Sequence, residues 1–203
     1  MTGIDAVIFD LGNVLISVNE HRAATRFAAR TGKSLAEIGA YFLSTPHATE
    51  LALGKQTKRQ FYRTVAHDLG FPGNYAEFAD IYADIFEPIP AMIELAQSLA
   101  TKRPRILLSN TNVIHADFFL ARYPWINEFD VVILSHEVGL LKPDLAIYEL
   151  ALQRAGILAD RAIFIDDLAA NIQGAQAAGL HVIHHRDPAV TRAELTNRGV
   201  LTI

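Results

Sequence analysis

The sequence predicts an α/β fold in which helices cover both faces of a parallel β-sheet. Three features indicate this class: short continuous apolar runs, helical stretches between them, and glycines that end two of these helices. Each apolar run is rich in Val, Ile and Phe and lacks a clean alternation of polar and apolar residues. This pattern is typical of a strand that is buried on both faces. Strands that alternate with helices predict a doubly wound sheet.

Four strong strand candidates and one weaker one follow in order along the chain. They are AVIFD (6–10), RILLSN (105–110), VVILSH (131–136), AIFIDD (162–167) and, more weakly, HVIHH (181–185). Helices are expected in the segments AMIELAQSLA (91–100), LAIYELALQRAG (145–156) and AANIQGAQAAG (169–179). The last two segments end in Gly, as a helix with a C-terminal cap does.

The segment between the first two strands is much longer than one crossover requires. Residues 16–87 read as a series of helices, among them NEHRAATRFAARTG and TKRQFYRTVAHDLG. The segment EPIP (87–90) is expected to return the chain to the sheet, because two prolines do not fit inside a helix. We therefore predict a core formed by residues 1–15 and 88–203, with a small helical domain inserted at 16–87.

Composition restricts the class of protein. Of 203 residues, 51% are hydrophobic and 20% are charged, which is enough apolar surface for a buried core. The net charge of −4 and the scattered Lys and Arg do not favour nucleic acid or an anionic membrane as a partner. The absence of Cys excludes disulfides and thiolate chemistry. No signal peptide or membrane-spanning run is recognisable, so we expect a cytoplasmic protein. The oligomeric state is not readable from the sequence.

Polar residues follow the strands where the strands end. In chain order they are Asp10, Ser109, Asn110, Lys142, Asp166 and Asp167. The carboxyl ends of parallel strands lie along one edge of a sheet, where such folds bind their ligands. A single strand-terminal Asp is as often a helix cap as a functional group, so the signal lies in the ordered set. Carboxylates with a lysine and a hydroxyl suit phosphate chemistry with Mg²⁺.

The segments VIFDLGNVL, ILLSN, GLLKPD and FIDDLAANIQGAQAAG resemble the four ordered motifs of the haloacid dehalogenase-like hydrolase superfamily. The resemblance extends over the whole chain and implies a Rossmann-like core with a helical cap at 16–87. FDLGNV, LSNTN and KPDLAIYELAL also resemble a sub-branch that includes α-D-glucose-1-phosphate phosphatase-like proteins. The family resemblance implies a hydrolase that forms an aspartyl-phosphate.

The resemblance also implies a role for each motif residue. Asp10 would be the nucleophile and a Mg²⁺ ligand. Ser109, with backbone N–H groups around Asn110, would bind the phosphoryl group. Lys142 would bridge the nucleophile and the phosphate as a fixed positive charge. The metal site is expected to comprise Asp10, the Gly12 carbonyl, Asp166 and Asp167, the last two directly or through water. Asn171 would orient its neighbours or cap a helix.

Gly12 departs from the family pattern. Most phosphatases of the family carry a second Asp there, which protonates the leaving oxygen and then activates water. General acid–base help is worth ~10²–10⁴-fold in rate. Three interpretations follow. The substrate has a good leaving group, as an anomeric sugar phosphate does, or His47 or Glu50 of the inserted domain supplies the proton and contacts the substrate. In the third interpretation, the chain is a weak hydrolase retained for binding.

The function predicted from the sequence is a Mg²⁺-dependent phosphatase of a small phosphorylated metabolite, with a sugar phosphate favoured. The alternative enzyme is a 2-haloacid dehalogenase, which shares the fold and the Asp nucleophile and needs no metal. Asp166 and Asp167 argue against it, because adjacent carboxylates near Asp10 repel one another without a cation. The third alternative is a non-catalytic binding protein on the same fold.

Overall fold

A five-stranded parallel sheet forms the centre of the protein in the computed structural model, which describes residues 3–201. The strands lie in the order β5-β4-β1-β6-β7, and each neighbouring pair is parallel. Their bounds are β1 Ala6–Phe9, β4 Arg105–Ser109, β5 Val131–Leu134, β6 Ala162–Asp166 and β7 His181–His184. The predicted α/β class is confirmed, and all five expected strands are present.

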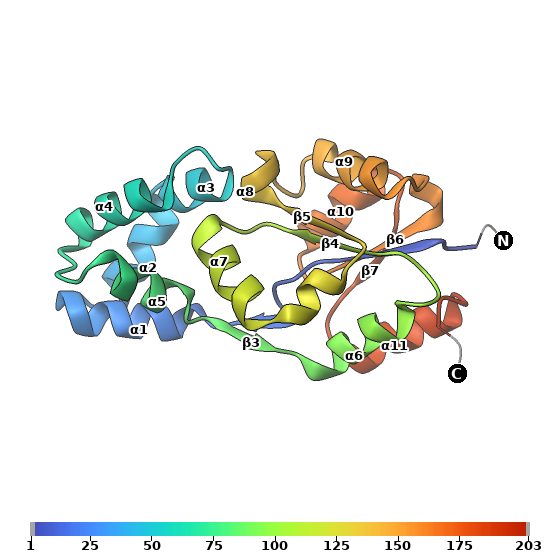
Figure 1. The fold of residues 1–203 in the computed structure, drawn as a ribbon, viewed down its shortest axis with the longest axis horizontal. Helices are drawn as coiled ribbons and strands as arrows, with labels where there is room; N and C mark the ends of the chain where they lie inside the picture. Colours follow the sequence, from blue (N-terminus) through green and yellow to red (C-terminus); the bar gives the residue numbers. More distant parts are fainter. Residues whose placement is uncertain (1–2, 202–203) are drawn as a thin grey trace.

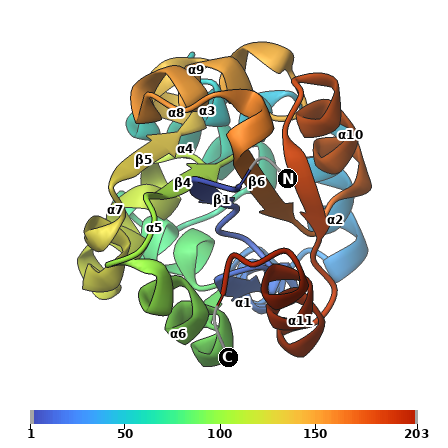
Figure 2. The same cartoon turned by 90° about the vertical axis from the view of Figure 1, so that its right-hand side faces the viewer.

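Helices cover both faces of this sheet (Figures 1 and 2). Val7 and Phe9 of β1 belong to one buried cluster, whereas Ala6 and Ile8 belong to the other. The first cluster includes residues of α6 Pro90–Leu99, α7 Val113–Arg122 and α11 Pro188–Asn197; the second includes residues of α9 Leu145–Ala155 and α10 Ala169–Ala177. Because both faces of β1 are buried, its sequence is apolar at every position.

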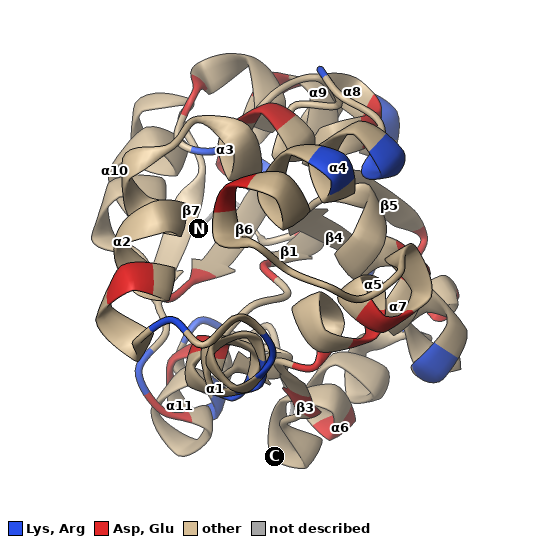
Figure 3. Cartoon of the chain, turned by 90° about the vertical axis from the view of Figure 1, so that its left-hand side faces the viewer, with Lys and Arg blue, Asp and Glu red and all other residues tan. Residues whose placement is uncertain are grey.

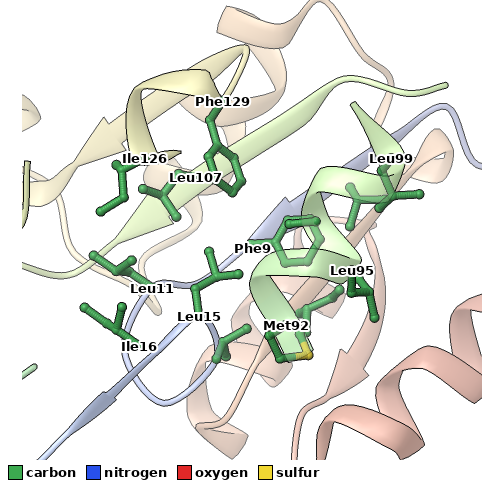
Figure 4. Close-up of a cluster of buried hydrophobic side chains, with 14 of the residues drawn as sticks. Phe9, Leu11, Leu15, Ile16, Met92, Leu95, Leu99, Leu107, Ile126 and Phe129 are labelled. Carbon is green, nitrogen blue, oxygen red and sulfur yellow. The ribbon is translucent and has the colours of Figure 1, made fainter. Parts of the chain in front are cut away.

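The loop after β1 is anchored by its own apolar side chains. Leu11 and Leu15 are buried in the cluster that also contains Phe9 of β1 and Met92 of α6 (Figure 4). Their burial removes apolar surface from water, which is worth about 1.5–3 kcal/mol for each fully buried side chain of this size. The turn that carries Asp10 and Gly12 is therefore held against the sheet.

Six helices lie between β1 and β4 in the sequence, and we call the first five of them the helical insertion. They are α1 Glu20–Thr31, α2 Leu35–Ser44, α3 His47–Ala52, α4 Lys58–Leu69 and α5 Tyr75–Ala83. Capping boxes begin two of them: Ser34 with Glu37, and Thr57 with Gln60. The insertion has a buried aromatic core of its own, centred on Phe78.

A two-stranded antiparallel ribbon joins the helical insertion to the sheet. β2 Ile16–Val18 pairs with β3 Phe86–Pro88, with Ser17 opposite Glu87. The sequence predicts EPIP as a non-helical return, and β3 now accounts for its first two residues. Pro90 lies in α6 at the first position, where the missing N–H is tolerated. The division into a core of 1–15 and 88–203 and a cap of 16–87 stays a prediction.

The helical insertion also contacts the sheet side of the molecule directly. Ser135, in the short helix α8 Ser135–Val138, donates its hydroxyl to the carbonyl of Ala52 at 2.8 Å. Lys58 of α4 forms an ion pair with Asp117 of α7 at 2.6 Å. Seen from the side of the insertion, basic and acidic segments are interspersed among the helices (Figure 3). Within residues 3–201, no helix combines the length and the apolar character that crossing a bilayer requires.

Candidate active site

Three strands of the sheet bring the predicted polar residues together at one edge. Asp10 directly follows β1, Ser109 ends β4, and Asp166 ends β6. β1 lies between β4 and β6, so the three strand ends are neighbours. The Asp10 carboxylate oxygen Oδ1 accepts a hydrogen bond from the N–H of Leu11 at 2.7 Å. The central strand thus presents Asp10 in a fixed orientation at the middle of the edge.

Lys142 links two of these carboxylates. Its Nζ lies 2.7 Å from Oδ1 of Asp10 and 2.7 Å from Oδ2 of Asp166, and only 1% of its side chain is exposed. Asn110 holds the backbone of Lys142: its amide nitrogen donates to the Lys142 carbonyl at 2.9 Å, and its amide oxygen accepts from the Lys142 N–H at 2.8 Å. The lysine is therefore positioned by the residue that follows Ser109.

Asp166 is fully buried, and both of its oxygens already accept hydrogen bonds. Oδ1 accepts from the N–H of Leu168 at 2.8 Å, and Oδ2 accepts from Lys142. The amide nitrogen of Asn171 lies 3.0 Å from each of the two oxygens. Together these contacts occupy the roughly four lone-pair sites of a carboxylate. Asn171 therefore orients Asp166, one of the two roles expected for it.

Helix α10, which carries Asn171, packs closely against the segment that carries Lys142. A side-chain carbon added at Gly174 would lie 2.5 Å from the carbonyl oxygen of Pro143, the residue after Lys142. Tyr148 donates its hydroxyl to the carbonyl of Asn171 at 2.8 Å. Glycine at position 174 therefore lets the helix that carries Asn171 pack against the segment that carries Lys142.

Asp10, Asp166 and Asp167 can offer carboxylate oxygens that all lie within 4.8 Å of one another. Three ionised carboxylates and one lysine leave a net charge of −2 here. Asp167 is half-buried, and its side chain accepts one hydrogen bond, from the amide of Asn13 at 3.2 Å. Hard oxygen donors with excess negative charge suit Mg²⁺. The residues present therefore fit a divalent cation.

Burial controls the charge state of Asp10. Loss of solvation raises the pKa of this carboxyl to about 7; the Lys142 ammonium opposes the rise, and the nearby Asp166 carboxylate adds to it. A cation bound beside Asp10 favours the ionised form, because opposite charges lower the pKa of an acid. With a cation bound, a larger fraction of Asp10 is therefore ionised, which is the form that attacks phosphorus.

A cavity of about 270 Å³ opens beside these residues. Gly12, Ser109 and Asn110 line it, as do Thr111 and Asn112. The half-buried Gly12 leaves little spare room, since a side-chain carbon there would lie 3.3 Å from Cγ2 of Val18. A phosphoryl group in this cavity would lie next to Ser109 and the turn after Asp10.

His47 and Glu50 lie elsewhere in the helical insertion. Nδ1 of His47 is 4.0 Å from Oε2 of Glu50, and both residues belong to α3. Gln56 donates to the His47 carbonyl at 2.7 Å. Neither residue lines the cavity beside Ser109. Their role as proton donor or substrate contact stays a prediction, and the geometry gives it no support.

Two residues that the sequence analysis did not single out, Tyr82 and His115, line the cavity. Their rings stack with centroids 4.5 Å apart. Burial lowers the pKa of His115 to about 4, so the ring is neutral. Its Nε2 lies 3.1 Å from the carbonyl of Tyr82, and its Nδ1 lies 3.0 Å from the amide nitrogen of Asn112. Because Nε2 donates and Nδ1 accepts, no ring nitrogen is left to protonate a leaving group.

The chain resembles known proteins over nearly its full length. A sesquiterpene phosphatase, astK of Aspergillus oryzae, is 29% identical over 200 residues, which cover 96% of each chain. A D-ribitol-5-phosphate phosphatase of Bacteroides thetaiotaomicron is 23% identical over 95% of this chain and 97% of its own. A crystal structure of a haloacid dehalogenase family enzyme from the same organism, in complex with magnesium and inorganic phosphate, superposes with a TM-score of 0.84 at 24% identity, covering 91% of this chain and 95% of that one.

The family model for haloacid dehalogenase-like hydrolases matches residues 4–179. The match includes the four segments that carry Asp10, Ser109, Lys142 and the Asp166–Asp167 pair, and these are the residues that the fold brings to one edge of the sheet. This protein belongs to the haloacid dehalogenase-like hydrolases.

Proposed function

We propose that this protein is a Mg²⁺-dependent phosphatase that hydrolyses a small phosphorylated metabolite through an aspartyl-phosphate on Asp10. The observation that carries the proposal is the buried Lys142 ammonium, 2.7 Å from both Asp10 and Asp166 beside a third carboxylate. A carboxylate that attacks a phosphate must overcome like-charge repulsion, and fixed positive charge lowers that barrier. The phosphatase relatives support the same chemistry.

The reaction divides into two displacements at phosphorus. The carboxylate of Asp10 forms a bond to phosphorus while the bond from phosphorus to the substrate oxygen breaks. That oxygen leaves with the electron pair and takes a proton from solvent water. Water then attacks the phosphorus of the aspartyl-phosphate, which releases inorganic phosphate and restores Asp10. Ser109 and Lys142 hold the phosphoryl oxygens, and Lys142 keeps Asp10 oriented.

Asp10, Asp167 and the Gly12 carbonyl would hold the Mg²⁺ directly. Asp166 is the weaker candidate for direct contact, because Lys142, Asn171 and the Leu168 N–H already use its lone pairs. When bound, the cation neutralises negative charge that builds up on the phosphoryl oxygens. Asp166 would then contribute to the metal site through water or through its contact with Lys142.

The test is phosphate release from p-nitrophenyl phosphate and a panel of phosphorylated metabolites, with Mg²⁺ and with EDTA. We expect turnover in Mg²⁺ and none in EDTA. For Asp167→Asn we expect the Mg²⁺ concentration at half-maximal rate to rise about 10–100-fold, the scale on which changes around a metal reduce its affinity. The control is Asp144→Asn, at an exposed residue that does not end a strand. This variant should keep the wild-type Mg²⁺ concentration at half-maximal rate. Equal turnover in EDTA contradicts the metal dependence.

Gly12 predicts a preference for substrates with good leaving groups, because no side chain at this position protonates the leaving oxygen. We expect the rate to fall steeply as the pKa of the leaving alcohol rises. Gly12→Asp should restore up to ~10²-fold for the poorest leaving groups. Val18 has to shift by a few tenths of an ångström to admit it, and the contact is with a side-chain methyl.

The matched control for Gly12→Asp is Gly12→Asn, which has the same shape without an acidic proton. Both are measured against a series of aryl and alkyl phosphates. Equal rates across the series for the wild type, or an equal gain from Asn and Asp, contradict this explanation.

The sequence predicts a sugar phosphate as the substrate, and the relatives include enzymes named for a sugar-alcohol phosphate and for a sesquiterpene. The dehalogenase alternative gains no support, because three clustered carboxylates call for a cation that displacement of halide from carbon does not need.

A further inference from the structure

A second cavity of about 270 Å³ lies inside the helical insertion, between α1, α2 and α5. It shares five lining residues with the cavity beside Ser109: Glu20, Ala48, Tyr82, Ile85 and His115. The two cavities therefore adjoin, and the second extends the first away from the catalytic residues.

The wall of this second cavity is apolar. Phe27, Ile38 and Phe42 line it together with three alanines, and Phe27 and Ile38 belong to the aromatic core of the insertion. Leu43 also lines it, although 91% of that side chain is exposed. An exposed leucine beside an apolar cavity becomes covered when an apolar ligand enters, and that burial favours binding.

Gly39 indicates that helix α2 leaves this space open. Glycine lies in the interior of α2, where it is among the least favourable residues for helix formation. Its backbone is not in the left-handed region, and a side-chain carbon built on it meets nothing within 4 Å. Neither backbone conformation nor a close neighbour requires glycine here. The missing side chain enlarges the cavity that Gly39 lines.

The polar groups on this wall have little capacity to bind hydroxyls. Both ring nitrogens of His115 are already bonded. The Tyr82 hydroxyl and the Glu20 carboxylate are the remaining polar side-chain groups among the lining residues. A sugar or polyol would bury several hydroxyls here without partners, which disfavours binding.

We propose that the substrate is the phosphate monoester of a mainly apolar hydroxyl compound whose oxygen is a good leaving group, as that of a phenol is, and whose hydrocarbon part occupies the cavity in the helical insertion. The inference rests on the proposed phosphatase function and specifies the substrate class of the same site. The phosphoryl group lies beside Ser109 and Asp10, and the chain passes Tyr82 and Ile85 into the space left by Gly39. Hydrolysis follows the same two displacements at phosphorus, and the apolar hydroxyl compound is the leaving group.

The test is a binding series that does not depend on turnover. Unbranched alkylphosphonates of increasing length keep the phosphonate constant and cannot be hydrolysed, and their Kd is measured by calorimetry with Mg²⁺. We expect Kd to fall about fourfold for each added methylene until the cavity is full, the fold-change that corresponds to ~0.8 kcal/mol per buried CH₂. Methylphosphonate and glucose 1-phosphate should bind more weakly than octylphosphonate.

Gly39→Leu fills the cavity from α2 and should weaken octylphosphonate binding about 10-fold or more while leaving methylphosphonate unchanged. Ala40→Leu adds a leucine at the neighbouring exposed position of the same helix, and it should match the wild type. A Kd independent of chain length, or tighter binding of glucose 1-phosphate than of octylphosphonate, overturns the inference. Failure of the phosphatase proposal is separate: it appears as no release of phosphate from p-nitrophenyl phosphate, whatever the phosphonates do.

Discussion

Replacing Asp10 with asparagine is expected to lower phosphate release by at least ~10⁴-fold, the scale of the loss when a catalytic nucleophile is removed. Asparagine keeps the shape of the side chain, but its amide does not form a stable bond to phosphorus. The measurement is turnover of p-nitrophenyl phosphate with Mg²⁺. Wild-type turnover in this variant would exclude Asp10 as the nucleophile.

The same variant should be more stable than the wild type when no metal is bound. Burial raises the pKa of Asp10 above its value in the unfolded chain. A carboxyl of this kind favours the folded state while it is protonated, and this contribution is lost as pH rises through the folded pKa. Thermal unfolding in EDTA should therefore show a gain in Tm that is small near pH 4 and grows toward about pH 8.

Asp5→Asn is the matched control. Asp5 immediately precedes β1 and pairs with Arg161 at 2.7 Å, at the opposite end of the strand from Asp10. The same change of residue there should leave turnover unchanged. It should also produce no gain in Tm at high pH, because pairing with Arg161 lowers the pKa of Asp5. A gain in Tm with Asp5→Asn would show that the effect is not specific to the active site.

Lys142→Met is expected to affect activity and stability together. The variant removes the only positive charge that contacts Asp10 and Asp166 within the described residues, 3–201. We expect the rate to fall ~10²–10³-fold, as when a fixed electrostatic contact to the reacting group is lost. Removing one partner of a buried ion pair typically costs ~3–5 kcal/mol, which for a chain of this length is roughly 10 °C in Tm.

The pH dependence of this loss separates electrostatics from packing. Without the ammonium, the pKa of Asp10 rises further, because Lys142 is the group that lowers it. Protonated Asp10 is tolerated beside the Asp166 carboxylate, whereas ionised Asp10 repels it. The deficit in Tm should therefore be larger near pH 8 than near pH 5 in EDTA. A deficit independent of pH would indicate lost packing alone.

Lys58→Met provides the comparison for Lys142→Met. Lys58 pairs with Asp117 at 2.6 Å, but both side chains are about half exposed. Surface pairs of this kind contribute about 0–1 kcal/mol. The control should therefore change Tm little and leave turnover at the wild-type level. Equal losses from the two substitutions would contradict the special role of Lys142.

The parallel strands and the strand-end residues were predictable from the sequence because burial on both faces leaves a local signature. Every residue of β1 and β4 is buried, so continuous apolar runs mark them. The ribbon strands β2 and β3 are only three residues long and include Pro88, so they leave no such run. Helix α3 has six residues and follows Pro46, and a segment this short has almost no periodicity.

The site residues that directly follow a strand could be predicted from the sequence. The contacts that join segments far apart in the sequence could not. Asp10, Ser109 and Lys142 could be named from their order. The pairing of Asn110 with the Lys142 backbone joins residues of different elements, and no spacing reveals it. Tyr82 and His115 come from the insertion and the sheet side, and their stacking exists only after both have packed. Asn112 caps the N-terminus of the helix that carries His115, and an Asn before a helix indicates a cap in the sequence without indicating a binding site.

The ribbon formed by β2 and β3 has a consequence for how the chain folds. β1 and β4 are neighbours in the sheet, with Val7 opposite Arg105, although the entire helical insertion separates them in sequence. Closing so long a loop costs conformational entropy before any contact compensates for it. Once Ser17 and Glu87 pair, the two ends of the insertion lie side by side, and only short connections remain between β1 and α6. The ribbon thus converts a distant strand pairing into a local one and lowers the effective contact order of the sheet.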